Sequence, residues 1–209
     1  MRQKRFLATL CPAATNICIL HNNMLLTQHI ASILPLSREL EQAVKKASRN
    51  IELAKGETIL EKGQRCSHLY FTESGLLRGY YFDESKEITH WFAREGEFAT
   101  GFYSFISKEP SFEYIQALED CLLTQIAYAD LQKLYAAFPE TERLGRLITE
   151  NYYLKLEERL LSLQFKTAKE RYNSLLERNA KLLQRVALGQ IASYLGITQE
   201  TLSRIRAEG

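Results

Sequence analysis

The sequence predicts an α+β chain with three consecutive parts: a β jelly roll, a long helix suited to dimerisation, and a helix-turn-helix unit. Between residues 51 and 126, short apolar runs follow a period of two and are separated by turn residues. A stretch with leucine at every seventh position comes next, and roughly the last twenty residues read as two short helices around a glycine. The 209 residues are 45% hydrophobic and 25% charged, which is ordinary for a globular chain that buries its own core.

The first domain is expected over residues 24–138, and it begins with two helices. Pro35 separates the two helical stretches, and Ser37 is placed to cap the second one. Residues 1–23 combine a basic start with a mildly apolar run that Pro12 interrupts, faintly like a secretory signal. We expect these 23 residues to be either a disordered extension outside the fold or the product of a start codon assigned too early.

The strands of the first domain are expected where apolar runs alternate with turns that contain Gly, Asp, Ser or Lys. Many short strands at this spacing are typical of a small antiparallel barrel or jelly roll. The expected runs are residues 58–60, 69–71, 77–82, 88–92, 115–118 and 122–126.

A long helix is expected over residues 139–164, with Pro139 at its start. One apolar stripe suggests that this helix pairs with its copy in a second chain, and the polar Asn151 within the stripe could fix the register of the pair. The alternative is a helix that packs only on its own barrel. Because Leu156, Leu160 and Leu163 lie on the opposite face, we expect the helix to contact both the barrel and a partner. The residues predicted for the dimer contact are Leu144, Leu147, Ile148, Asn151, Leu154 and Leu161.

The third part, residues 165–209, is predicted to be a helix-turn-helix domain. Thr167 and Glu170 have the spacing of a capping box at its first helix. Further along, Ala192 is small where two helices must approach, Gly196 suits the turn between them, and Thr198 can cap the second helix. This order of residues is typical of the unit that inserts a helix into the DNA major groove.

The exposed side of the last helix is expected to be polar and basic. The whole chain has a net charge of +2, but residues 165–209 contain eight Lys or Arg and four Glu. A basic end on a slightly acidic body suits a polyanionic partner. The polar residues of this helix are Gln199, Glu200, Thr201, Ser203, Arg204 and Arg206.

The segment 191–206 resembles the C-terminal DNA-reading segment of the Crp/Fnr (catabolite activator and fumarate-nitrate regulator) family of transcription regulators. The segments 55–63 and 69–78 resemble the opening strands of that family's cyclic-nucleotide-binding-type domain, and the likeness extends over roughly residues 25–207. The resemblance implies a cytoplasmic homodimer, joined by the long helix, that reads a near-palindromic site in double-stranded DNA. A member that activates transcription would also contact RNA polymerase.

The resemblance also assigns roles within the last helix. On the family motif, Gln199, Glu200 and Arg204 take the base-reading positions, where Gln suits adenine, Glu accepts from cytosine and Arg pairs with guanine. The remaining polar residues are expected to contact the DNA backbone. These residues are Thr198, Thr201, Ser203, Arg206 and, ahead of the motif, Arg185.

The ligand segment of the first domain departs from the family pattern. Relatives that bind cyclic AMP hold its phosphate with an arginine, yet no arginine occurs between Arg94 and Arg143. The position that should hold it falls near Ser111 and Phe112. We therefore expect weak or no binding of cyclic AMP, and either a more apolar ligand or a purely structural barrel. The residues of this possible effector pocket are Phe102, Tyr103, Ser111 and Phe112.

Other classes of function receive little support. The four cysteines form no Cys-x-x-Cys pair, the four histidines show no ligand spacing, and we expect no metal and no cofactor. No clustered acid, base or nucleophile indicates an enzyme, and no segment is long and apolar enough to span a membrane. The remaining alternative is a ligand-binding signalling module that acts through protein contacts without DNA.

Overall fold

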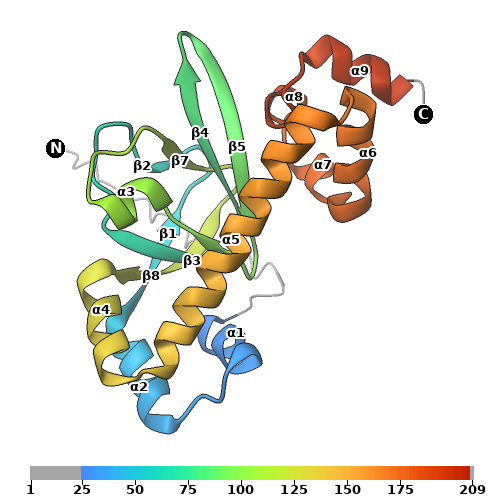
Figure 1. The fold of residues 1–209 in the computed structure, drawn as a ribbon. Coiled ribbons are helices and arrows are strands. Elements are labelled where there is room, and N and C mark those ends of the chain that lie inside the picture. Colours follow the sequence, from blue (N-terminus) through green and yellow to red (C-terminus); the bar gives the residue numbers. More distant parts are fainter. Residues whose placement is uncertain (1–24, 208–209) are drawn as a thin grey trace, which may run out of the picture.

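The computed structural model describes residues 25–207, so the predicted extension over residues 1–23 lies outside the described residues. Two short helices, α1 (Leu26–Ile33) and α2 (Arg38–Ala47), precede the sheets (Figure 1). The Ser37 hydroxyl accepts a hydrogen bond from the Leu40 amide at 3.1 Å, as its predicted role as a helix cap requires. Ile30 and Val44 are buried and anchor the two helices to the first domain.

Eight strands form two antiparallel four-stranded sheets, in the orders β1-β8-β3-β6 and β2-β7-β4-β5. This arrangement confirms the predicted jelly roll, and each predicted strand run falls in a strand or at its end. The first strand, however, begins at Ser48 rather than Ile51, because three polar residues already pair with β8. The strands are β1 (Ser48–Leu53), β2 (Thr58–Leu60), β3 (His68–Ser74), β4 (Leu76–Asp83), β5 (Lys86–Arg94), β6 (Phe98–Ala99), β7 (Tyr114–Ala117) and β8 (Cys121–Ala127).

The space between the sheets holds the main hydrophobic core, which includes Leu77, Ile115 and Leu123, all fully buried. Gly79 of β4 lies under the indole of Trp91 in β5, and a Cβ atom at Gly79 would lie 2.1 Å from the Trp91 ring. The absence of a side chain at this position therefore allows the indole to pack against the sheet. Two helices complete the domain: α3 (Phe102–Ser107) between β6 and β7, and α4 (Tyr128–Ala137) after β8.

The long helix α5 (Glu140–Phe165) has 26 residues and runs along the barrel toward the C-terminal helices (Figure 1). Its first half packs on its own chain, because Leu144 and Ile148 join a cluster formed by α1, α2, α4 and β8. The prediction that Leu144 faces a partner is therefore wrong, because its side chain is buried within its own chain. For the half-buried Ile148 the partner contact stays a prediction. The spacing of apolar residues along a helix predicts that one face is buried, but it does not say whether the same chain or a second chain covers that face.

The second half of α5 is apolar and exposed. Leu154 and Leu161 of the predicted dimer stripe are 57% and 48% exposed, Asn151 is also exposed, and Leu147 is half-buried. The helix does contact the barrel, as predicted, through Tyr152 and Arg159. The leucines of the opposite face are exposed as well. The exposed fractions are 49% for Leu156, 54% for Leu160 and 40% for Leu163.

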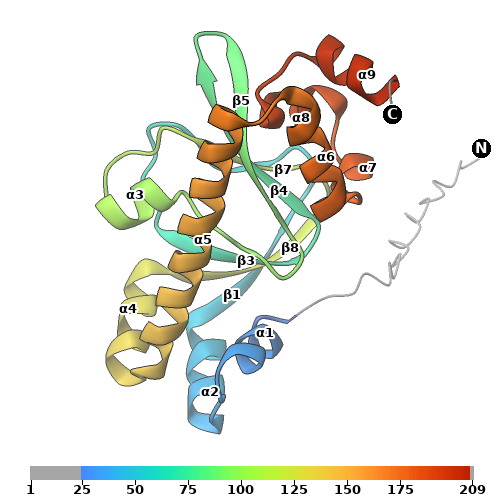
Figure 2. The same cartoon turned by 45° about the vertical axis from the view of Figure 1, so that its right-hand side comes forward.

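The C-terminal domain consists of four helices, and it lies at the far end of α5 from α1 and α2 (Figure 2). Its first helix opens with the predicted capping box between Thr167 and Glu170. Its core is continuous with the barrel, because Leu76 and Leu118 belong to the same buried cluster as the domain's own Ile191 and Leu202. The helices are α6 (Ala168–Asn179), α7 (Leu182–Arg185), α8 (Leu188–Leu195) and α9 (Gln199–Ala207).

Candidate nucleic-acid interface

A fixed turn sets the angle between α8 and α9. Gly196 ends α8 in the left-handed conformation, with φ of +67°, and its amide donates to carbonyl oxygens of the last turn of α8. The amide of Ile197 donates to the Ala192 carbonyl oxygen at 3.0 Å, so the last turn of α8 is closed. A side chain at position 196 would be strained, and its Cβ would meet Leu163 of α5 at 2.9 Å.

The helix α9 begins with the predicted cap and is amphipathic. The Thr198 hydroxyl accepts a hydrogen bond from the Thr201 amide at 3.2 Å. Leu202 is fully buried and Ile205 is 9% exposed, so both hold α9 against the domain core. The other side of α9 is consequently left for solvent or a partner.

The structure brings the predicted reading residues together on that outer side. Thr201 is half-buried, and the other candidates are exposed. Within residues 25–207, the side chains of Arg204 and Arg206 make no hydrogen bond and no ion pair. Hydrogen bonds from its own backbone amide and from Thr198 lower the pKa of Glu200, so its carboxylate is anionic at neutral pH. The exposed candidates are Thr198, Gln199, Glu200, Ser203, Arg204 and Arg206.

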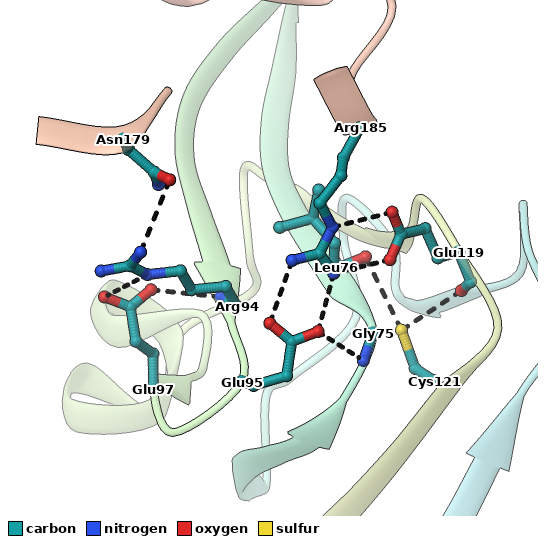
Figure 3. Close-up of polar contacts among 9 residues, drawn as sticks. All are labelled: Gly75, Leu76, Arg94, Glu95, Glu97, Glu119, Cys121, Asn179 and Arg185. Atoms are coloured by element: carbon teal, nitrogen blue, oxygen red, sulfur yellow. Dashed lines mark hydrogen bonds and ion pairs between the residues drawn. The ribbon is translucent and has the colours of Figure 1, made fainter. Parts of the chain in front are cut away.

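Arg185 at the end of α7 contacts the barrel, and its guanidinium points toward the turns that carry Glu95 and Glu119 (Figure 3). It donates to both carboxylate oxygens of Glu95, at 2.7 and 3.0 Å, and to both of Glu119, at 2.6 and 2.9 Å. The pKa of Arg185 is raised chiefly by these hydrogen bonds. In this arrangement its guanidinium is occupied, so the prediction that Arg185 contacts the DNA backbone does not describe this conformation.

A second set of contacts joins α8 to β5 and α5. Arg159 of α5 donates to the backbone oxygens of Tyr194 at 2.7 Å and Thr89 at 3.0 Å, and it lies over the Tyr194 ring. Ser193 accepts from the Thr89 amide at 2.9 Å and donates to the Glu87 carbonyl oxygen at 2.8 Å. The C-terminal domain is therefore bound to both the barrel and the long helix.

The predicted effector residues are only partly brought together. The rings of Tyr103 and Phe112 lie 5.6 Å apart, and both side chains are about half exposed. Phe102 instead stacks on Tyr152 of α5 at 3.8 Å. Ser111 is buried, and its hydroxyl exchanges hydrogen bonds with the backbone of Glu113.

Sequence reasoning missed Glu113. This carboxylate is 3% exposed and accepts from the Trp91 indole at 3.0 Å and contacts the His90 ring nitrogen at 2.8 Å. Glu113 directly precedes β7 and continues the alternation of the buried Ile115 and Ala117, so the period of two already indicated that this acid faces inward.

The barrel contains one buried arginine, Arg78, which lies outside the arginine-free stretch between Arg94 and Arg143. Arg78 of β4 is 4% exposed and bonds Gln116 at 2.9 and 3.1 Å and Glu87 at 2.7 Å. Alternation places it with Leu76, on the face opposite the core residue Leu77. It therefore does not replace the missing arginine near Ser111.

No group of three or more metal-ligating side chains occurs among the described residues. Cys66 and Cys121 are buried free thiols, and burial raises the pKa of Cys121 to about 11. The other two cysteines, Cys11 and Cys18, lie outside the described part of the chain. None of the helices between residues 25 and 207 is both long and apolar enough to cross a membrane.

Comparison with known proteins matches this chain to a domain family and to regulatory proteins. The sequence model described as a cyclic nucleotide-binding domain matches residues 50–138. The chain is 29% identical over 181 residues to the fumarate and nitrate reduction regulatory protein of Vibrio cholerae, covering 80% of this chain and 71% of that protein. It is 26% identical over 182 residues to electron transport regulator A of Shewanella oneidensis, covering 81% and 72% of the two chains.

Solved structures share the fold. FixK2 from Bradyrhizobium japonicum superposes with a TM-score of 0.68 at 20% identity, covering 77% of this chain and 83% of that one. A transcriptional regulator of the Crp/Fnr family from Eubacterium rectale gives a TM-score of 0.66 at 18% identity, with coverages of 84% and 88%. The jelly roll, the long helix and the C-terminal helices therefore occur together in other proteins.

Proposed function

Because the chain belongs to the Crp/Fnr family of transcription regulators, we propose that it is a homodimer that binds a near-palindromic site in double-stranded DNA with α9. The observation that carries this proposal is the polar outer side of α9, which is held at a fixed angle by Gly196 and Thr198. A helix presented in this way fits the major groove. Such a regulator acts in the cytoplasm, and as an activator it would also contact RNA polymerase.

Within α9, Gln199, Glu200 and Arg204 are the base-reading residues of the proposal. The outward position of all three supports it, as does the absence, within residues 25–207, of an ion pair that would occupy Arg204. The phosphate contacts are assigned to Thr198, Thr201, Ser203 and Arg206, the last of which also lines a small apolar pocket beside Tyr172.

Dimerisation is assigned to the second half of α5, with Leu147, Asn151, Leu154 and Leu161 along the seam. Its support is the exposure of this stripe, since an isolated helix that exposes so many leucines is unfavourable in water. Two copies of α9 would then enter successive major grooves about 34 Å apart.

Motion of the barrel, transmitted along α5, would change the spacing between the two α9 helices.

The barrel is proposed not to respond to cyclic AMP. Ser111 stands where a phosphate-binding arginine is expected, and the nearby buried acid Glu113 would repel a phosphate. Calorimetric titration with cyclic AMP should give no heat of binding at micromolar ligand. Saturable micromolar binding would show that this part of the proposal is wrong, without affecting the role of α9.

The experiment that tests the proposed function measures duplex binding by fluorescence anisotropy as a function of salt. Arg204→Ala should cost about 1–3 kcal/mol of binding free energy and relax specificity at one base pair. Arg38→Ala is the matched control, because Arg38 is equally exposed but lies on α2. If Arg204→Ala discriminates operator from scrambled DNA as wild type does, the assignment fails. If wild type ignores all duplexes at low salt, a regulator acting through protein contacts becomes the better account.

A further inference from the structure

The barrel presents two acidic side chains that bracket one guanidinium of the C-terminal domain (Figure 3). Glu95 lies in the turn between β5 and β6, and Glu119 lies between β7 and β8. Both approach Arg185 of α7, whose side chain is 25% exposed. The two acids belong to the barrel and Arg185 belongs to the C-terminal domain. The ion pairs between them therefore form only when this domain docks on the barrel as it does here.

The acidic pair is held in place by the barrel itself. Glu95 also accepts a hydrogen bond from the Gly75 amide at 3.1 Å, so its position is fixed independently of Arg185. Gly75 has φ of +93°, and a Cβ atom there would lie 2.6 Å from the Asp120 carbonyl oxygen and the Cys121 sulfur. The glycine thus lets the turn that supports Glu95 approach the turn that carries Glu119.

Arg185 cannot make this contact and a full phosphate contact at the same time. A guanidinium has five N–H donors, and four hydrogen bonds already run from Arg185 to the carboxylate oxygens. A phosphate placed beside Arg185 in this arrangement would also meet two negative carboxylates. Planar, bidentate pairing is how arginine recognises carboxylates and phosphates alike.

We propose that Glu95 and Glu119 hold Arg185 in place of a DNA phosphate, so that the barrel restrains DNA binding until this contact opens. The inference rests on the proposed function of the chain as a DNA-binding regulator. Binding to DNA and the contact with the barrel then compete for one side chain, and each weakens the other by the same factor. The restraint is independent of DNA sequence, because a phosphate contact carries no base information.

The test compares four proteins in duplex binding across a range of salt: wild type, Arg185→Ala, Glu95→Gln with Glu119→Gln, and the triple variant. The glutamine pair should bind about 5- to 10-fold more tightly than wild type, at the lower end of allosteric couplings because the contact is partly solvated. Its salt dependence should steepen by about 0.9 in the log–log slope, the value of one phosphate contact. Arg185→Ala alone should change the affinity for duplex DNA little, because Arg185 is already held by the two acids. In the triple variant it should abolish the gain in affinity that the glutamine pair produces.

A charge-matched control separates this effect from general electrostatics. Glu39→Gln with Glu52→Gln removes the same charge from exposed positions on α2 and β1 and should give a much smaller gain. Equal gains in both double variants, or weaker binding in the Glu95/Glu119 variant, would overturn the proposal. Thermal melting of each variant checks folding, and Arg185→Lys, which keeps the charge but loses the planar fork, should fall between wild type and the glutamine pair. If wild type itself binds no DNA, the proposed function fails first and this inference fails with it.

Discussion

Single glycines fix where larger groups can pack in this protein. Gly79 leaves room for the indole of Trp91, and that indole in turn donates to the buried Glu113. A sequence search for turn glycines finds Gly196, whose role follows from local chemistry. It does not find Gly79, because the reason for that glycine is a side chain on the neighbouring strand.

Gly79→Ala should lower the free energy of unfolding by about 1–3 kcal/mol, because the added methyl group forces the Trp91 ring to shift. Trp91 is the single tryptophan of the chain, so its fluorescence reports both the shift and the urea transition. Gly189→Ala is the control, since its Cβ would meet only the end of the Gln199 side chain, at 3.1 Å. Equal effects of the two substitutions would contradict the packing role assigned to Gly79.

The ion pair of Glu95 should make stability depend on pH. Burial alone would raise the pKa of Glu95, but hydrogen bonds from Arg185 and the backbone and the charge of Arg185 lower it below the usual 4.5. Its stabilisation is therefore fully present above about pH 4.5 and is lost as the pH falls through the lower pKa of the folded state. Arg185 and the Gly75 amide bond Glu95 directly, Glu119 shares Arg185 with it, and the Cys121 thiol is close enough to sense its charge.

Urea denaturation of wild type and Glu95→Gln measures this dependence. The difference in unfolding free energy should be a few tenths to about 1 kcal/mol at pH 7, since the pair is partly exposed. It should shrink as the pH is lowered from 7 to below 4.5, because the wild-type carboxylate then becomes protonated as well. A difference that stays constant between these pH values would mean that the charge of Glu95 contributes nothing.

Among the elements, local patterns predicted most of the fold. Strand runs, the Ser37 and Thr198 caps and the Thr167 capping box depend on neighbours within a few residues, and the structure confirms them. The environment of α5 could not be predicted in the same way. Leucines at every seventh position indicate only that one face of the helix is apolar. Leu144 is buried within its own chain because α1, α2 and α4 pack against it.

The proposed dimer seam of α5 can be tested by paired substitutions. Leu154→Lys with Leu161→Lys should raise the dissociation constant of the proposed dimer by about 100-fold, because four charges then enter the seam. Sedimentation of the purified protein measures this change. The control is Leu156→Lys with Leu160→Lys, on the opposite and equally exposed face of the same helix. Dissociation by the control pair alone would place the seam on the other face of α5.

At the scale of the whole molecule, the C-terminal domain is bound to the barrel at two separate places. Arg185 contacts Glu95 and Glu119, while Ser193 and Arg159 hold α8 against β5. The charge of Arg185 and its place in the C-terminal domain predict a contact with the DNA backbone. Its acidic partners are 66 and 90 residues away in the chain, and only the folded arrangement reveals them.

Selection of bound sites from a random duplex library by the full chain at low ionic strength tests whether two copies of α9 read DNA. We expect enrichment of two inverted half-sites whose centres lie about 34 Å apart, one helical turn of DNA, with binding that weakens steeply as salt rises. A folded protein that sediments as a monomer and enriches no sequence would contradict this expectation.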